Sequence, residues 1–204
     1  MIHEFKEEMV TKFKMSDLGK LTYYLGIEVH QNSEGTTLKQ ESYAAKILEE
    51  AGMGECNVCQ IPMEVNLKLS KGQNEKSVSE KEYRRSIGCL RYLLHTRSDL
   101  SFVVGMLIWY MQEPRESHNA LLKQVLRYLR RIVSYGLSYQ RAIGMNLIGY
   151  SDSSHNPDAD DGRRTTGHIF HLERCLIMWC SSKQENVALS SFEAEFMAAT
   201  EAAK

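Results

Sequence analysis

The 204-residue chain has no long apolar segment. Its longest apolar stretch, from Phe102 to Met111, is interrupted by Gly105 and is far shorter than the roughly 20 residues of a membrane-spanning helix. The N-terminus is charged from Glu4 onward and lacks the apolar run of about 7–15 residues that a secretory signal contains. We therefore expect no membrane partner and no secretion, and predict a cytoplasmic or nuclear protein.

The chain also lacks an excess of charge of either sign. It has 25 basic and 26 acidic residues, which gives a formal net charge of -1. This balance does not predict that the chain as a whole binds a polyanion. Any surface that contacts nucleic acid must then be a local patch.

The five cysteines do not provide the closely paired set of four ligands that a structural zinc site requires. Cys56 and Cys59 form one CxxC pair, but Cys89 stands alone, and Cys175 and Cys180 have the wrong spacing for a second pair. In a chain without a secretory signal such cysteines are interpreted as reduced thiols. We expect no zinc site and no disulfide framework.

The first 65 residues predict a helix, a hairpin and a second helix. Apolar residues recur at helical spacing over residues 2–14. Two β-branched and aromatic runs, 21–30 and 36–40, flank the turn-forming residues 32–35 and predict antiparallel strands. A second amphipathic helix is expected over 42–51, with Gly52 as its stop.

The middle of the chain predicts a linker and three helices. Residues 66–79 are polar and indicate an exposed loop. Ser79 and Glu82 have the spacing of a capping box that begins a helix reaching His95. Ser98 is expected to cap a second helix that runs to about Met111, and a third helix is expected over 117–133.

The third of these helices has a basic face. Its leucines and valine lie on one side at 100° per residue, and the opposite side carries Lys123, Arg127, Arg130 and Arg131. One interpretation is the solvated outer face of a core helix. The other is contact with nucleic acid, because four cations along one helix face could pair with successive phosphates.

The last third of the chain predicts a β-meander followed by a helix. Apolar and β-branched runs at 146–150, 165–172 and 175–179 indicate three short strands. Good helix formers follow from Ser191, and Ser190 with Ser191 is the expected N-cap. The chain as a whole is therefore predicted to be α+β.

Three carboxylates in this region have positions that suit a divalent-metal site. Asp152 follows the first predicted strand, and Glu193 and Glu195 lie in the first turns of the last helix. Two-metal phosphodiesterases need converging carboxylates, since Mg²⁺ prefers oxygen ligands. By spacing alone the signal for a metal site is weak, because carboxylates after strands and in the first turns of helices are usually solvated or favoured by the helix dipole.

At these residues and over nearly its whole length, the sequence resembles the Pol polyproteins of copia-type LTR retrotransposons. The resemblance is carried by eight blocks in a fixed order: Phe13–Gly19, Tyr24–Val29, Tyr83–Gly88, Thr96–Leu100, Leu126–Arg130, Gly149–Asp152, Trp179–Gln184 and Val187–Phe196. Each block alone is a modest signal. Their order and spacing together are a strong one.

The resemblance implies three segments. Residues 1–65 would be part of a reverse transcriptase palm with its primer-grip hairpin, followed by a helix. Residues 66–140 would be a linker and a helical thumb or connection segment, and residues 141–204 a truncated RNase H-like β-meander plus helix. The implied activity of the family is reverse transcription together with hydrolysis of RNA in RNA/DNA hybrids.

The resemblance also assigns roles to the carboxylates. Asp152 matches the first-strand aspartate of the family, and Glu195 is favoured over Glu193 because it begins an E-x-x-A-x-x-x-A pattern. Both would be catalytic ligands of Mg²⁺ or Mn²⁺. The implied partners are an RNA/DNA hybrid or other nucleic acid and the remainder of the polyprotein.

Departures from the family pattern argue against activity. The polymerase motif Tyr-Val-Asp-Asp is absent, Ser154 and His155 replace an aspartate and a tryptophan, and Gly162 replaces an arginine. The downstream RNase H aspartates are also missing. We expect an inactive polyprotein fragment, and the alternatives are a non-catalytic nucleic-acid-binding module or a degenerate reading frame without a cellular role.

Overall fold

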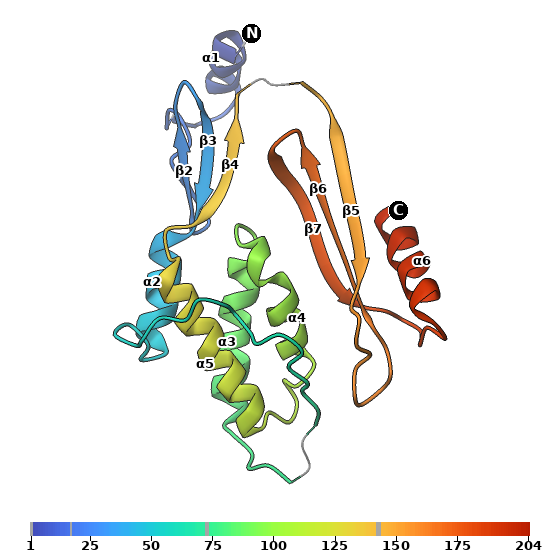
Figure 1. The fold of residues 1–204 in the computed structure, drawn as a ribbon. Coiled ribbons are helices and arrows are strands. Elements are labelled where there is room, and N and C mark those ends of the chain that lie inside the picture. Colours follow the sequence, from blue (N-terminus) through green and yellow to red (C-terminus); the bar gives the residue numbers. More distant parts are fainter. Residues whose placement is uncertain (1, 17, 72–73, 142–143) are drawn as a thin grey trace.

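The computed structural model describes residues 2–16, 18–71, 74–141 and 144–204. Within these ranges the fold is α+β, with six α-helices, one short 3-10 helix and two antiparallel sheets. A four-stranded sheet and a helical body form one part of the molecule, and a three-stranded sheet with a helix on one face forms the other (Figure 1). Gly72 and Gln73 of the predicted linker lie outside the described residues.

The first sheet contains the predicted hairpin and one further strand. Its strand order is β1-β2-β3-β4, and its members are β1 (Tyr23–Tyr24), β2 (Ile27–Gln31), β3 (Gly35–Lys39) and β4 (Gly136–Gln140). The turn between β2 and β3 is closed by Asn32, whose side chain accepts the N–H groups of Glu34 and Gly35 at 2.9 Å. β4 was not predicted, and it pairs along the whole of β3.

Four helices form the body of the molecule, close to the predicted positions. They are α2 (Glu41–Glu50), α3 (Glu80–Leu93), α4 (Ser101–Ile108) and α5 (Glu116–Arg131). The Ser79 hydroxyl accepts the Glu82 N–H, so the predicted cap of α3 is confirmed. The predicted Ser98 cap is wrong, because Ser98 begins a 3-10 turn and α4 begins at Ser101 without a side-chain cap.

The main core lies between these helices. It is formed by aliphatic side chains such as Ile87, Leu107, Val125 and Leu129, none of which is measurably exposed. Fully burying one such side chain contributes about 1.5–3 kcal/mol. α2 and α4 pack against α3 and α5, so the first two predicted segments share both this core and the β3–β4 pairing.

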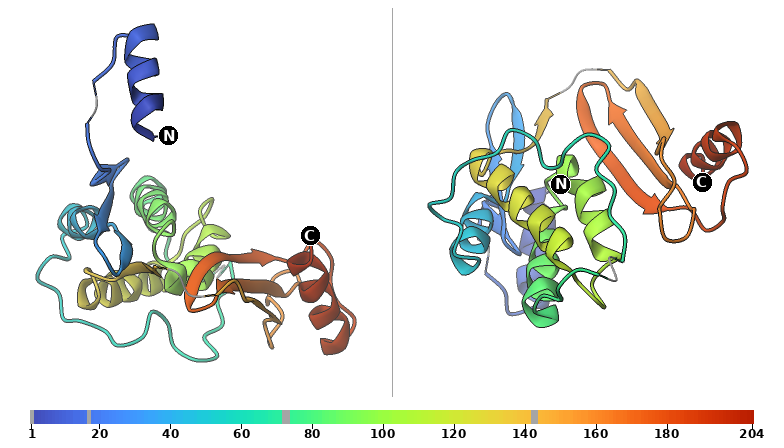
Figure 2. Two further views of the ribbon diagram at one scale, coloured as in Figure 1. Left: turned by 90° about the horizontal axis from the view of Figure 1, so that it is seen from above. Right: turned by 60° about the horizontal axis from the view of Figure 1, so that its bottom comes forward.

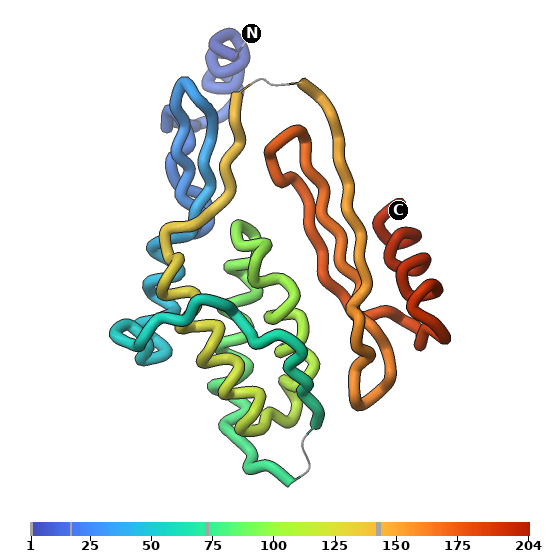
Figure 3. The backbone as a smooth tube through the Cα atoms, in the orientation of Figure 1, coloured from blue at the N-terminus to red at the C-terminus, as the bar shows by residue number. Residues whose placement is uncertain are grey.

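The segment between α2 and α3 has no regular structure, as predicted, but it is not exposed throughout. Figure 3 shows its backbone crossing the helical body. Leu69 is buried in the core, with Met63 and Leu67 half-buried beside it. The prediction of a wholly exposed linker is therefore wrong at Leu69, where an apolar side chain within a polar stretch packs into the core.

The N-terminal helix α1 (Ile2–Lys12) has no buried residue. Figure 2 shows it standing apart from the rest of the molecule. Its apolar side chains Ile2, Phe5 and Val10 remain exposed. Among the described residues, no helix has the length and apolarity needed to cross a membrane.

The second sheet is the predicted meander, with strand order β5-β6-β7. It comprises β5 (Leu147–Ser153), β6 (Thr165–Leu172) and β7 (Cys175–Lys183), and is followed by α6 (Ser191–Ala202). α6 contacts β5 and β6 on one face of the sheet, whereas α4 contacts β7 (Figure 1). In the described part of the chain β5 is an edge strand, with Leu147 59% exposed and Tyr150 60% exposed.

Candidate functional site

The start of α6 places its two glutamates in different surroundings. The Ser190 hydroxyl accepts the Glu193 N–H at 3.1 Å, which confirms the predicted N-cap. The Glu193 carboxylate in turn accepts the Leu189 N–H at 2.6 Å. The Glu193 carboxylate is thus hydrogen-bonded to the backbone just before α6 and not to the sheet.

Glu195 lies two residues further along α6, and its side chain contacts β5. Its carboxylate accepts the Ser153 hydroxyl at 2.8 Å and the Ser153 N–H at 3.2 Å. Ser153 is buried, and it follows Asp152 directly in the strand. The structure therefore brings the favoured glutamate to the residue next to the predicted aspartate.

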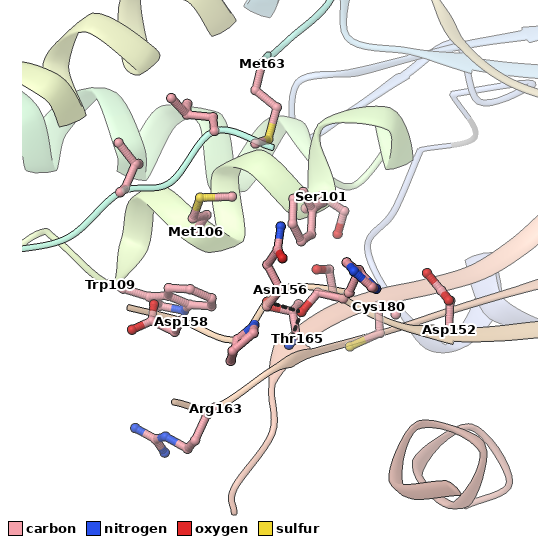
Figure 4. Close-up of a pocket in the computed structure, with 18 of the residues that line it drawn as sticks. Met63, Ser101, Met106, Trp109, Asp152, Asn156, Asp158, Arg163, Thr165 and Cys180 are labelled. Atoms are coloured by element: carbon pink, nitrogen blue, oxygen red, sulfur yellow. Dashed lines mark hydrogen bonds between the residues drawn. The ribbon is translucent and has the colours of Figure 1, made fainter. Parts of the chain in front are cut away.

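The two carboxylates themselves are not brought together. Successive side chains of a strand point to opposite faces, so Asp152 faces away from α6 while Ser153 faces it. Figure 4 shows the Asp152 side chain pointing away from the α6 ribbon, toward the side of the sheet where α4 lies. Because β5 and β6 pair residue for residue here, Asp152 shares its face with Gly167.

The arrangement does not form a metal site as it stands. Across the described ranges, no group of three or more histidine, cysteine or acidic side chains could hold an ion. A divalent cation needs several converging oxygens, whereas Glu195 is occupied by Ser153. The shared metal pair of Asp152 and Glu195 stays a prediction.

The basic face of α5 has contacts that the sequence did not indicate. The Arg127 Nε donates to the Asn57 carbonyl at 2.7 Å, Arg130 donates to the Cys56 carbonyl, and Arg131 donates to the Gln60 carbonyl at 3.4 Å. These arginines hold the segment before Leu69 against the helix. Lys123 and Arg131 are exposed, whereas Arg127 and Arg130 are half-buried.

A charged cluster at the end of β7 was also missed. The Lys183 ammonium lies 3.2 Å from Asp158 and 2.7 Å from Asp161, and 4.2 Å from the ring centroid of Trp109 in the helical body. Burial opposes ionisation of Asp161, but hydrogen bonds from Lys183 and Arg163 outweigh it and lower the pKa of Asp161. The cluster joins the second sheet to α4, and no sequence pattern pairs these distant residues.

The fold and these contacts define a class: an α+β protein in which a helical body carries one hairpin sheet and a second, meander sheet with a carboxylate-bearing helix. Residues 1–65 match the reverse transcriptase (RNA-dependent DNA polymerase) family. No solved structure matches the chain.

Relatives extend the match over most of the chain. It is 34% identical over 196 residues to the retrovirus-related Pol polyprotein from transposon RE1 of Arabidopsis thaliana, covering 96% of this chain and 13% of that protein. It is 32% identical to the Pol polyprotein from transposon TNT 1-94 of Nicotiana tabacum, over 100% of this chain and 16% of the relative.

A shorter relative matches over most of both chains. This uncharacterized mitochondrial protein of Arabidopsis thaliana is 33% identical, over 94% of this chain and 79% of its own length. The chain belongs to the family of copia-type retrotransposon Pol polyproteins. It spans about an eighth of the length of the RE1 polyprotein.

Proposed function

We propose that the chain joins part of a reverse transcriptase to part of an RNase H domain, and that it does not hydrolyse RNA by itself. Residues 1–65 would supply the palm with its primer-grip hairpin, and residues 66–140 the linker and the helical connection. Residues 141–204 would supply the front of the RNase H domain. The match of residues 1–65 to reverse transcriptases supports the first assignment.

One observation carries the RNase H assignment. An antiparallel meander is followed by a helix whose Glu195 is hydrogen-bonded to the strand residue next to Asp152. These are the two carboxylates that the family resemblance selects. The contact of Glu195 with the strand neighbour of Asp152 supports a common ancestry with the nuclease site.

The proposed lack of activity rests on the same residues. Reverse transcriptases use divalent metals, but Asp152 points away from α6 (Figure 4), and the Glu195 carboxylate on α6 is already bonded to Ser153. With two carboxylates so arranged, neither metal nor attacking water would be positioned. We therefore derive no hydrolytic step for this chain.

The test is cleavage of a labelled RNA/DNA hybrid by the purified chain, in Mg²⁺ and separately in Mn²⁺. Asp152→Asn serves as the control for contaminating host nuclease. We expect no cleavage above background in either metal. Cleavage that requires metal and disappears in Asp152→Asn would overturn the proposal, whereas cleavage that persists in the variant would come from a contaminant.

A second candidate function is binding of nucleic acid without catalysis. The exposed side chains of Lys123 and Arg131 on α5 favour it, because exposed cations can neutralise phosphates. The same hybrid, measured by fluorescence anisotropy in EDTA, should then bind with an affinity that falls steeply with salt. Binding that is unchanged in the double variant Lys123→Ala, Arg131→Ala would count against this role for α5.

A further inference from the structure

A cavity lies between the helical body and the face of the second sheet that α6 leaves uncovered. Its volume is about 610 Å³, and its lining comes from α4, from the segment before Leu69, and from β5, β6 and β7 with the loop between β5 and β6. Figure 4 shows Met63, Met106 and Trp109 on one side of it and the strands on the other. Sites for small molecules commonly have volumes of roughly 300–1,000 Å³ and mainly apolar walls.

The hollow results from the sizes of three side chains in one row of the sheet. Strand register places Asp152, Gly167 and Ser181 side by side on the cavity face. A Cβ on Gly167 would have the Cys180 carbonyl, at 3.9 Å, as its nearest neighbour. Small side chains in the middle of the face therefore leave space that larger ones would fill.

Flat and apolar side chains form the walls. The adjacent row of the sheet consists of Tyr150, Ile169 and Trp179, which the register places on the same face. Phe102 of α4 and Trp109, directly after α4, lie on the opposite side. Tyr150 is 60% exposed and Phe102 41% exposed, so apolar surface remains uncovered there. Aromatic walls of this kind favour a flat ring, which stacks against them or packs edge to face.

The cavity contains one carboxylate that has no partner within the described residues. The Asp158 side chain is 5% exposed and pairs with Lys183. Asp152 is exposed to solvent, no hydrogen bond or ion pair engages its side chain in the described ranges, and it points to the cavity side (Figure 4). An ionised carboxylate only accepts hydrogen bonds. A ligand that uses Asp152 must therefore donate.

The wall next to Asp152 is ordered by its own hydrogen bonds. The Ser154 hydroxyl accepts the Thr165 N–H at 2.9 Å and donates to the Asn156 carbonyl at 3.2 Å, as the dashed lines in Figure 4 mark. These bonds close the ends of the loop that lines the cavity. Since the wall is held in place before binding, a ligand would not have to order it.

We propose that this cavity is a binding site for a planar heteroaromatic ring that carries adjacent N–H donors, with Asp152 as its acceptor and Tyr150, Trp179 and Phe102 as its walls. The guanine ring has this chemistry, because its N1–H and 2-amino groups can donate together to one carboxylate. The site lies on the opposite face of the sheet from Glu195. It does not rest on the proposed function.

The intact chain contains a built-in reporter for this site. Its only two tryptophans, Trp109 and Trp179, both line the cavity. Guanosine and inosine are titrated into the protein while indole fluorescence is excited at wavelengths that nucleosides do not absorb. Inosine lacks the 2-amino group, so we expect guanosine to quench the fluorescence with an affinity about tenfold higher.

Two variants test the residues involved. Asp152→Ala should weaken the binding of guanosine about tenfold or more, which is the range for hydrogen bonds to a charged group. The variant should also bind guanosine and inosine equally well. Glu185→Ala is the matched control, since Glu185 is an exposed carboxylate outside the lining. Equal guanosine affinity in the Asp152→Ala variant would overturn the role of Asp152.

Filling the cavity tests the site itself. Gly167→Leu should abolish quenching by both nucleosides, and Gly88→Leu adds the same side chain outside the lining as a control. If the circular dichroism spectrum shows that Gly167→Leu does not fold, Ser181→Leu, which adds a side chain in the same row of the sheet, is used instead. The proposal would be overturned if guanosine did not quench the fluorescence of the unmodified chain saturably. It would also be overturned if guanosine still quenched the fluorescence of a folded variant whose cavity is filled by leucine.

One more measurement separates a free nucleoside from a base within a strand. A thymidine octamer with one central guanine is added as a competitor of guanosine. If the octamer displaces guanosine at concentrations equal to or lower than that of guanosine, the site is supported and its ligand is a guanine base within a single strand. If only the free nucleoside competes and the octamer does not, the site is supported and its ligand is a small molecule.

Discussion

The part of the molecule before residue 141 and the part after it are held together by different forces. Among the described residues, only Ala194 and Ala198 of the buried apolar residues come after residue 140. Both parts bury a few polar residues, such as His118 in the earlier part and Thr166 and Gln184 in the later one, but only the earlier part has a continuous aliphatic core. The second sheet is therefore held mainly by its strand pairing and by side-chain hydrogen bonds.

The difference explains why the unpartnered Asp152 and the space at Gly167 lie in the second part. A sheet with little apolar packing on either face leaves polar groups and hollows available, as at Asp152 and Gly167. The same property lowers its stability, because hydrogen bonds contribute only about 0.5–1.5 kcal/mol each in net terms. Its edge strand β5 also presents unpaired backbone groups to solvent, which favours association with other strands.

The largest expected effect comes from one substitution made in both parts. Leu107→Ala, in the helical core, should lower the free energy of unfolding by about 2–5 kcal/mol, because Leu107 is fully buried. Leu147→Ala, on the 59% exposed edge-strand residue, should change it by about 0.5 kcal/mol or less. Urea unfolding followed by circular dichroism measures both. Losses of similar size would show that the two parts are not held differently.

A smaller effect is expected where the second part relies on hydrogen bonds. The buried Gln184 side chain donates to the Thr166 hydroxyl at 3.1 Å and to the Ala194 carbonyl at 3.0 Å, which ties α6 to the sheet. Gln184→Ala should cost about 1–3 kcal/mol, the cost of leaving buried partners unsatisfied.

The measurement is hydrogen exchange of the α6 amides, which should speed up in Gln184→Ala while those of α3 do not change. Gln31→Ala, which removes one exposed hydrogen bond to the Leu21 carbonyl, is the matched control and should alter neither helix. Unchanged exchange in α6 would mean that the two alanines suffice to hold it.

Local sequence signals predicted most of the secondary structure. The caps at Ser79 and Ser190 and the turn at Asn32 each act within three residues, so their consequences can be read from the chain. The apolar and β-branched runs of the last third likewise predicted the three strands of the meander. These signals placed Glu195 correctly on the last helix, but they ended the first strand of the meander at residue 150, whereas β5 continues to Ser153 and includes Asp152.

Features that depend on distant partners were not predictable. The strand Gly136–Gln140 is five residues long and is stabilised by β3, about a hundred residues earlier. The face on which Asp152 lies follows from the register of β5 with β6, which no local pattern fixes.

The smallest expected effect is a pH dependence that arises in the helical body. His118 is buried, its ring stacks on Tyr110 at 3.9 Å, and its Nδ1 accepts the Arg115 N–H at 2.9 Å. Burial lowers the pKa of His118 below its usual range, against a hydrogen bond to the Ser70 carbonyl that raises it. The unfolded chain, with a histidine pKa of about 6.5, therefore binds a proton more readily than the folded one.

The stability that neutral His118 contributes is complete above about pH 6.5 and is lost as the pH falls below it. Urea unfolding between pH 7 and pH 5 should show a decline of at most about 1.4 kcal/mol per pH unit, the limit for one proton. His118→Gln should flatten this slope. Asp161→Asn should leave it unchanged, because the Asp161 pKa is lowered from 3.8 and its contribution is lost only in more acidic solution. A slope that persists in His118→Gln would assign the titration to another histidine and remove the helical body as its source.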